Sequence, residues 1–178
     1  MYFVFVDSIV IVWDYFNNIP KIIRIFLTIS EDFLKTDLFK YYPKIKKKSS
    51  PEIDKVVDFI KDFLKGEIKK IDIGILYLEK LSLFQKRVLL KVYEIPIGYV
   101  TTYKIIARSI KRPRSYRMVG RALATNPFPL IIPCHRVIKS DFTIGGYEGG
   151  IEMKKKLLLN EGIKIKNNKV INPKLWKF

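Results

Sequence analysis

The first 29 residues consist of three apolar segments, rich in β-branched and aromatic side chains, that turn-forming residues separate. The segments cover residues 2–6, 9–16 and 22–29, with Asp7-Ser8 in the first gap and Asn17 to Pro20 in the second. Apolar runs of this length with turn residues between them predict β-strands joined by hairpins. We therefore expect a small antiparallel meander of buried strands rather than a signal peptide, since no basic leader precedes the first segment.

One amphipathic helix is expected after the sheet. Ser50 and Pro51 are typical of a helix start, and Gly66 is typical of a helix end. Apolar residues recur between them at the spacing of one helix face, namely Ile53, Val56, Val57, Ile60 and Leu64. Residues from about 67 to 80 would link this part to the rest of the chain.

The second half of the chain has the pattern of short helices. Ser82, with Gln85 three residues later, is typical of a capped helix start. Thr102 is expected to cap a helix over residues 103–110, and Ser115 to cap another over residues 116–124. Two short helices joined by a tight basic connector predict a helix-turn-helix, and a last helix is expected over residues 151–161.

These patterns predict an α+β protein with two domains. Residues 1–77 would form a small N-terminal antiparallel sheet with a helix. Residues 78–178 would form a mainly helical C-terminal domain that contains a winged-helix-like helix-turn-helix. The longest charge-free run, residues 122–135, contains three prolines and is shorter than a bilayer requires, so we expect no membrane span.

Positive charge is concentrated in the second half of the chain. The formal net charge is +17, and residues 78–178 contribute +15 of it through 21 Lys and Arg against 6 Asp and Glu. No acidic residue occurs between Glu94 and Asp141, where seven basic residues crowd together: Lys104, Arg108, Lys111, Arg112, Arg114, Arg117 and Arg121. This distribution predicts a polyanion as partner. The basic runs from Lys44 to Lys48 and from Lys154 to Lys156 are expected to be solvated surface.

The chain has one cysteine and one histidine, and they are neighbours, Cys134 and His135. A cysteine nucleophile needs a group that takes its proton, nearby positive charge and a rigid backbone, and His135, Arg136 and Pro133 are the right residue types. The alternative is that Cys134 is a small buried apolar residue, as most free cysteines are. A single cysteine allows no internal disulfide, which suits a reducing cytoplasm. One cysteine and one histidine are also too few to form a usual zinc site of sulfur and nitrogen ligands. We therefore expect no metal and no cofactor.

Five motifs, in order, give residues 82–163 a resemblance to the 6-O-alkylguanine-DNA alkyltransferases. The first two concern DNA binding: Gly98 to Tyr103 resembles the entry to that family's helix-turn-helix, and Arg117 with Val119-Gly120 resembles its recognition helix. The next two surround the cysteine: Asn126-Pro127 resembles the turn before the active site, and Ile131 to Val137 resembles the signature around the reactive cysteine. The fifth, Gly145 to Gly150 with Glu161-Gly162, resembles the substrate loop and the relay carboxylate.

The resemblance implies that Cys134 takes an alkyl group from the 6-oxygen of guanine by in-line displacement at carbon. It further implies that Glu161 orients His135, which removes the Cys134 proton through a water molecule. Tyr103 would donate a proton or a hydrogen bond to the departing guanine, and Asn126 would brace the two halves of the site. Because the product is a thioether, each protein molecule would act once.

The resemblance also implies a partner, duplex DNA that contains 6-O-alkylguanine, and we expect a monomer in the cytoplasm to bind it. The damaged base must leave the stack, and Arg117 would fill the space it vacates. Gly120 and Ala124 are small enough to enter the minor groove, although packing against another helix explains Gly120 equally well. Further expected DNA contacts are Thr102, Ser115 and Arg121, and the expected substrate loop contains Gly145, Tyr147 and Glu148. Glu148 stands where many relatives would carry a small or neutral residue.

Two other functions remain open on the sequence. The first is a DNA-binding protein without catalysis that senses lesions or regulates a gene; Cys134 argues against it, because a sensor needs no nucleophile. The second is a cysteine hydrolase that uses Cys134 with His135. A hydrolase turns over many substrate molecules, whereas alkyl transfer is stoichiometric.

Overall fold

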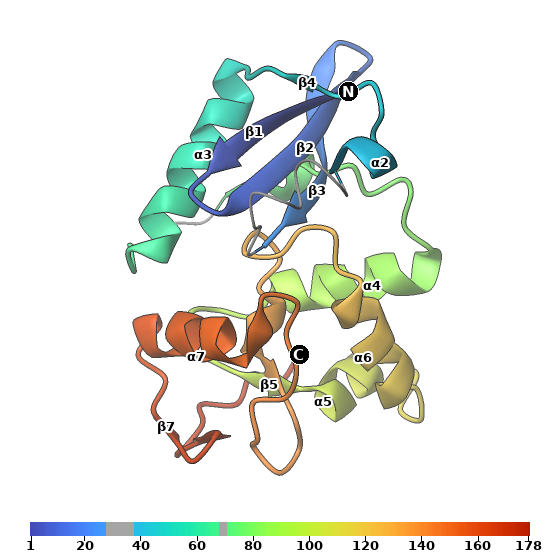
Figure 1. Cartoon of the computed structure of the whole chain (residues 1–178). Helices are drawn as coiled ribbons and strands as arrows, with labels where there is room; N and C mark the ends of the chain where they lie inside the picture. Colours follow the sequence, from blue (N-terminus) through green and yellow to red (C-terminus); the bar gives the residue numbers. More distant parts are fainter. Residues whose placement is uncertain (28–37, 68–70) are drawn as a thin grey trace. The chain divides into compact units, whose positions relative to one another are not determined.

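A computed structural model describes residues 1–27, 38–67 and 71–178 of the chain (Figure 1). These residues form two compact units. The first unit consists of Met1–Tyr77 together with Pro127–Pro129, and the second consists of Leu78–Asn126 together with Leu130–Phe178. Each unit has a buried apolar core of its own.

The first unit is built on a four-stranded sheet in the order β3-β2-β1-β4. The antiparallel meander is confirmed: β1 (Tyr2–Val6) pairs with β2 (Ile9–Phe16), which pairs with β3 (Ile19–Phe26). The short strand β4 (Lys46–Lys47) adds a parallel pair with β1, so that the sheet is mixed. β3 begins three residues before the expected Ile22, because an edge strand tolerates Pro20. The expected end of this strand at residues 28 and 29 lies outside the described residues.

The β2–β3 hairpin turns at Asn17 and Asn18, which both have positive φ, 50° and 61°. Two such residues in a two-residue loop are typical of a type I′ turn. The expected helix, α3 (Pro51–Leu64), begins after Ser50, whose hydroxyl accepts a hydrogen bond from the Ile53 N–H at 3.4 Å. It packs against β1 through its buried face. Two single-turn elements, α2 (Phe39–Tyr41) and η2 (Ile73–Ile75), complete the unit.

Residues 127–129 belong to the first unit although they are distant from it in the sequence. The Ile25 N–H donates a hydrogen bond to the Pro127 carbonyl at 2.8 Å, and Phe128 is fully buried. Nothing in the sequence around these residues predicts this placement, since a Pro-rich connector reads as an exposed loop.

Three helices of the second unit pack against one another: α4 (Leu83–Tyr93), α5 (Tyr103–Ser109) and α6 (Tyr116–Ala124). Two expected caps are confirmed, because the hydroxyl groups of Ser82 and Thr102 accept hydrogen bonds from the N–H groups of Gln85 and Ile105. The expected Ser115 cap is wrong: the Ser115 side chain makes no capping bond. Its backbone, at φ −92° and ψ 20°, has a turn conformation rather than the extended one that a capping side chain requires.

A parallel pair of short strands brings two distant segments of the second unit together. β5 (Thr101–Thr102) pairs with β6 (Val137–Ile138). Helix α5 starts directly after β5, and the 3₁₀ turn η3 (Cys134–Arg136) ends directly before β6. The pairing therefore places the start of α5 beside the segment that carries Cys134.

The rest of the second unit supports this arrangement. Helix α7 (Gly150–Asn160) contacts η3, and a hairpin of β7 (Ile165–Lys166) and β8 (Lys169–Val170) follows it. A buried cluster joins these elements: Val100, Ile138, Ile144, Leu158, Ile163 and Val170.

The predicted α+β class is confirmed by the sheet of the first unit and the helices of the second. In the part of the chain that the structure describes, no helix is both long enough and apolar enough to cross a bilayer.

Candidate active site

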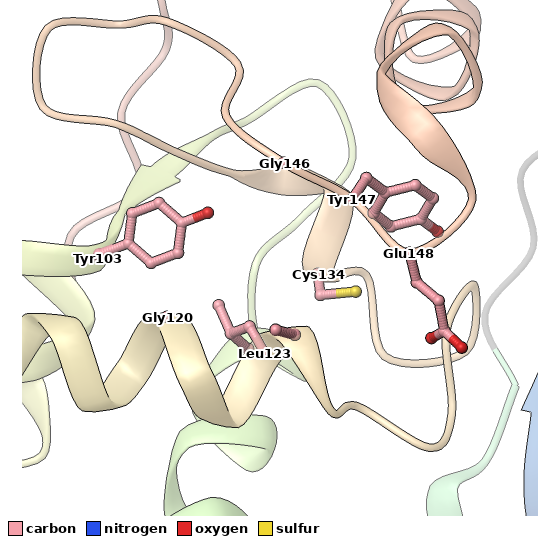
Figure 2. Close-up of a pocket in the computed structure, with 8 residues that line it drawn as sticks. Tyr103, Gly120, Leu123, Cys134, Gly146, Tyr147 and Glu148 are labelled. Atoms are coloured by element: carbon pink, nitrogen blue, oxygen red, sulfur yellow. The ribbon is translucent and has the colours of Figure 1, made fainter.

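Cys134 lies at the base of a cavity of about 360 Å³ in the second unit (Figure 2). Helix α6 forms one side of the cavity, residues 146–148 form the other, and the ring of Tyr103 lies at one end. The Cys134 side chain is mostly buried, with 8% of the residue exposed, but its sulfur lines the cavity rather than the closed core. The volume is in the range of sites that bind small organic groups. This placement favours a reactive cysteine over a packing cysteine.

Asn126 connects the end of α6 to the cysteine segment. Its side-chain amide donates to the Ile132 carbonyl at 3.2 Å and to the Cys134 sulfur at 3.2 Å. The residue is almost completely buried, with 1% exposed. A buried amide with both contacts fixes the position of the sulfur relative to the helix, which is the geometry that the predicted bracing role of Asn126 needs.

His135, Arg136 and Glu161 form a buried cluster behind the cavity. The His135 Nε2 and Glu161 Oε1 atoms are 2.8 Å apart. Arg136 donates from Nε to Glu161 Oε2 and from Nη2 to Oε1, each at 2.8 Å, and from Nη1 to the Ile95 carbonyl at 2.6 Å. The structure therefore brings Glu161 to His135, and it corrects the sequence interpretation of Arg136, whose charge faces Glu161 rather than the thiol.

The protonation states in this cluster follow from burial and from the hydrogen bonds. Burial by itself would raise the pKa of Glu161, but the hydrogen bonds and charges of His135 and Arg136 outweigh it and lower the pKa. Burial, with the positive charges of Arg136 and Lys154, lowers the pKa of His135 although the neighbouring Glu161 acts to raise it. At neutral pH the site thus holds an ionised Glu161 and a neutral imidazole. The Nε2 proton then points to the carboxylate, which leaves Nδ1 as the basic nitrogen.

The Cys134 thiol is not ionised in advance. Burial raises its pKa, and the negative charge of Glu148 raises it further. The hydrogen bond from Asn126 and the positive charge of Lys154 act in the opposite direction. Because burial is the largest of these effects, the resting protein holds a thiol, and nucleophilic attack requires a base that removes its proton.

Lys154 is the residue of this site that the sequence interpretation missed. Instead of lying in solvent, it is fully buried on α7, and burial lowers its pKa to about 8. Its Nζ donates to the Val137 carbonyl at 2.7 Å and to the Gly146 carbonyl at 3.3 Å, so that it connects the start of β6, directly after η3, to the loop of residues 145–150. The expectation of a solvated Lys154 is wrong. A usable signal was present, since Lys154 shares the helix face of Leu157, Leu158 and Glu161.

Tyr103 is the first residue of α5 and reaches the cavity from the β5 side. Burial raises the pKa of its hydroxyl, and the nearby Cys134 adds to this effect, so Tyr103 keeps its proton at neutral pH. Gly145 lies opposite with φ +68°, and a Cβ placed there would come within 3.4 Å of the Tyr103 hydroxyl oxygen. A larger residue at position 145 would therefore be strained and would crowd Tyr103.

Helix α6 presents an exposed face beside the cavity. Arg117, Arg121 and Ala124 are exposed, and Gly120 is partly exposed, while Val119, Ala122 and Leu123 are buried. A Cβ placed on Gly120 would lie 3.8 Å from the Tyr103 ring, which is an ordinary contact. Gly120 is therefore not required by packing within this unit.

The remaining expected DNA contacts occupy different surroundings. Thr102 is 5% exposed, and its hydroxyl is used as the cap of α5. Ser115 is half-buried at the start of α6. Their contacts with DNA, like the roles of the other site residues, stay predictions.

The fold and the site define an α+β protein in which a cysteine at the base of a cavity lies beside a basic helix. Among the described residues, no group of three His, Cys, Asp or Glu side chains is placed to hold a metal ion. Residues 83–163 match the sequence model of the 6-O-methylguanine DNA methyltransferase DNA-binding domain.

Known proteins extend this match beyond the DNA-binding domain. The chain is 45% identical over 120 residues to the methylated-DNA–protein-cysteine methyltransferase of Methanothermobacter thermautotrophicus, a match that covers 66% of each chain. The structure of an O6-methylguanine DNA methyltransferase from Methanococcus jannaschii aligns with a TM-score of 0.65 at 30% identity, covering 95% of this chain and 99% of that one. Mycobacterium tuberculosis OGT in complex with DNA aligns with a TM-score of 0.66 at 26% identity, covering 90% and 91%.

The chain belongs to the 6-O-methylguanine DNA methyltransferase family. Its sequence match spans 66% of the length of the Methanothermobacter relative and about half of three other archaeal relatives, between 48% and 51%. Residues 83–163, which match the family model, contain the residues that line the cavity, the cluster of His135, Arg136 and Glu161, and helix α6.

Proposed function

We propose that this protein repairs DNA by transferring the alkyl group of 6-O-alkylguanine in duplex DNA to Cys134, once per molecule. The observation that carries the proposal is the sulfur of Cys134 at the base of a cavity whose wall is helix α6, with an imidazole–carboxylate pair behind it. Guanine inside a duplex hides its 6-oxygen, so the base must first rotate into the cavity at a cost of a few kcal/mol.

The chemical step follows from the protonation states. In the proposed reaction, Nδ1 of His135 accepts the Cys134 proton through a water molecule, while Glu161 holds the imidazolium that forms. The sulfur attacks the alkyl carbon in line with the 6-oxygen; the S–C bond forms as the C–O bond breaks, and the electron pair stays on guanine. The Tyr103 hydroxyl, which is protonated at neutral pH because its pKa is raised, donates a hydrogen bond or its proton to the guanine that carries the released electron pair.

Two further residues support this step without forming or breaking a covalent bond. Asn126 holds the sulfur through its amide, and Lys154 lowers the pKa of the thiol through its charge. Asn126 would thus act directly on the sulfur, and Lys154, whose ammonium bonds the Val137 and Gly146 carbonyls, would act as a positioning residue. The thioether product has no neighbouring group in the described cavity that would cleave it, which explains the proposed single turnover.

We propose that helix α6 enters the minor groove of the duplex. Arg117 would occupy the space that the rotated base leaves, and Gly120 and Ala124 would let the backbone approach closely. The basic residues before α6 would contact phosphates and supply most of the affinity. In this proposal residues 78–178 carry both binding and chemistry, residues 1–77 support them, and the protein acts as a monomer in the cytoplasm.

The deciding experiment is alkyl transfer to a single residue. The protein is mixed with duplex that contains radiolabelled 6-O-methylguanine, and the digest is mapped by mass spectrometry. We expect one methyl group per molecule, on Cys134, and none on a C134S variant. Binding without covalent label would leave a non-catalytic DNA-binding protein. Turnover of an ester or amide by catalytic amounts of protein would indicate a cysteine hydrolase instead.

A further inference from the structure

Residues 165–176, which follow helix α7, form a segment that we call the tail segment. It contains the β7–β8 hairpin and then an irregular stretch that ends at Trp176. The tail segment lies outside residues 83–163, which match the family model, and none of its residues, all of which the structure describes, lines the cavity around Cys134. Its backbone nevertheless pairs with both chain segments that lead into this cavity.

The irregular stretch of the tail segment pairs with the chain just before Tyr103. The Val100 N–H donates to the Lys174 carbonyl at 3.0 Å, and the Trp176 N–H donates to the Val100 carbonyl at 2.8 Å. The hydroxyl of Thr101, a fully buried residue, donates to the Trp176 carbonyl at 2.9 Å. Strand β5 also pairs with β6, so this part of the chain has hydrogen-bonded neighbours in both the tail segment and β6. These contacts fix the backbone from which helix α5 and Tyr103 start.

The β7–β8 hairpin of the tail segment pairs with the chain just before the loop of residues 145–150. The Ile144 N–H donates to the Asn168 carbonyl at 3.0 Å, and the Val170 N–H donates to the Phe142 carbonyl at 2.9 Å. Because the loop starts directly after Ile144, the hairpin fixes the point at which the loop begins.

The two chain segments that the tail segment holds meet at the Tyr103 hydroxyl. Gly145 lies so close that a Cβ placed on it would be 3.4 Å from the hydroxyl oxygen. A shared apolar cluster supports this arrangement, since it buries Val100 before β5, Ile144 before the loop and Val170 of the tail segment. The tail segment therefore fixes the Tyr103 side and the loop side of the cavity relative to each other.

We infer that the tail segment is a positioning element of the alkyl-transfer site: through the Thr101–Trp176 hydrogen bond, it holds the Tyr103 hydroxyl where that hydroxyl meets the departing guanine. The inference rests on the proposed function and adds two positioning residues to it, because Thr101 and Trp176 lie outside the cavity. The covalent step is unchanged: the S–C bond forms as the C–O bond breaks, and Tyr103 donates to the guanine that carries the released electron pair. A shift of a catalytic group by about 1 Å can slow a reaction by up to about 100-fold, so the loss of one hydrogen bond just before Tyr103 should be measurable.

The test is a double-mutant cycle between Thr101 and Tyr103. Thr101 is changed to Val, which keeps the shape of the side chain and removes the hydroxyl, and to Ser, which keeps the hydroxyl; each change is made in the wild type and in Y103F. Single-turnover rates are measured with 6-O-benzylguanine, a free base whose reaction needs no DNA, by the appearance of benzylated Cys134 in mass spectra. T101V should slow the wild type about tenfold, and T101S should restore the rate. In Y103F, T101V should have no further effect, because the hydroxyl that it misplaces is already absent.

Variants in the tail segment and at the far end of α5 complete the set. W176P removes the N–H that donates to Val100, whereas W176A removes the same ring and keeps the N–H. W176P should slow the wild type more than W176A does, but should not slow Y103F further, so the inference is tested even if T101V does not fold. S109A is the matched control, since the Ser109 hydroxyl donates to a carbonyl within α5 rather than to the tail segment, and its rate should equal that of the wild type.

The outcomes separate the inference from the function on which it rests. Equal slowing by T101V in the wild type and in Y103F would overturn the inference, because the effect would not pass through the Tyr103 hydroxyl, and so would a T101V protein as fast as the wild type. A Y103F protein as fast as the wild type would overturn the inference together with the role of Tyr103, while transfer to Cys134 stands. Absence of methyl transfer to Cys134 from duplex that contains 6-O-methylguanine would overturn the proposed function itself.

Discussion

Replacing Lys154 by Met tests whether a buried ammonium group sits beneath the site. Lys154 is fully buried, and burial lowers its pKa from the usual 10.5 to about 8. Since the pKa in the folded protein lies below that of the unfolded chain, the unfolded chain binds more protons between pH 8 and pH 10.5. The contribution of Lys154 to the free energy of unfolding therefore increases as pH rises from 8 to 10.5.

The gain follows from the pKa difference. A fall from 10.5 to about 8 corresponds, at about 1.4 kcal/mol per pKa unit, to about 3 kcal/mol. The K154M variant has no such group, so the free energy of unfolding of the wild type minus that of K154M should rise by about 3 kcal/mol between pH 8 and pH 10.5. The raised pKa values of Tyr103 and Tyr147 act in the opposite direction, but they are present in both proteins and cancel in the difference.

The assay is guanidinium unfolding at a series of pH values, followed by the fluorescence of the two tryptophans. Both proteins should carry C134S, because the pKa of the Cys134 thiol is itself shifted by burial and because the charges of the thiol and of Lys154 act on each other. Parallel stability profiles for the two proteins would refute the reasoning, since they would mean that the pKa of Lys154 is the same in the folded and unfolded states. If the free energy of unfolding of the Lys154 protein minus that of the K154M protein instead falls as pH rises, the predicted direction of the effect is wrong.

Three further predictions concern DNA. Replacing Arg117 by Ala should slow reaction with duplex about tenfold or more and leave reaction with free 6-O-benzylguanine unchanged, because the exposed guanidinium is needed only when a base has left the stack; equal losses on both substrates would contradict this role. Replacing Gly120 by Ala should raise the free energy of unfolding by up to about 1 kcal/mol, since the added Cβ makes only an ordinary contact, yet it should slow duplex reaction; a slower reaction with the free base would point to packing within the site instead. The affinity for duplex should fall steeply as salt rises, in a titration followed by fluorescence anisotropy, and a flat salt dependence would contradict phosphate binding by the basic stretch.

The elements of this fold that local chemistry determines were predictable from the sequence. The β1–β2–β3 meander follows from apolar runs and turn residues, and the starts of α3, α4 and α5 follow from Ser50, Ser82 and Thr102. The Ser115 cap failed because the turn before α6 sets the backbone of that residue, and a residue type does not reveal its φ and ψ. The mixed sheet was also unpredictable, since β4 is two residues long and has no apolar alternation.

Site residues of rare types could be predicted from the sequence. Contacts between site residues that are far apart in the sequence could not. Cys134 and His135 stand out as the only residues of their kinds in the sequence, and Glu161 stands out as an acid at the end of a helix. The partner of Arg136 was not visible, because 25 residues separate it from Glu161 and only the fold brings them together. Lys154 was hidden by its neighbours Lys155 and Lys156, which made it part of a basic run rather than of an apolar helix face.

The pairing of Arg136 with Glu161 explains how the site can move a proton while buried. Glu161 lies at the C-terminal end of α7, where the helix dipole disfavours an anion, and the two-pronged contact of Arg136 offsets this penalty. In the resting state the thiol and imidazole are neutral, and the Arg136–Glu161 pair has no net charge. When the Cys134 proton moves to His135, the new positive charge is next to Glu161, and the new negative charge is in the field of Lys154. The net charge of the site is the same before and after the transfer, so burial opposes only the separation of charge over a short distance, which is a much smaller penalty than burying one isolated ion.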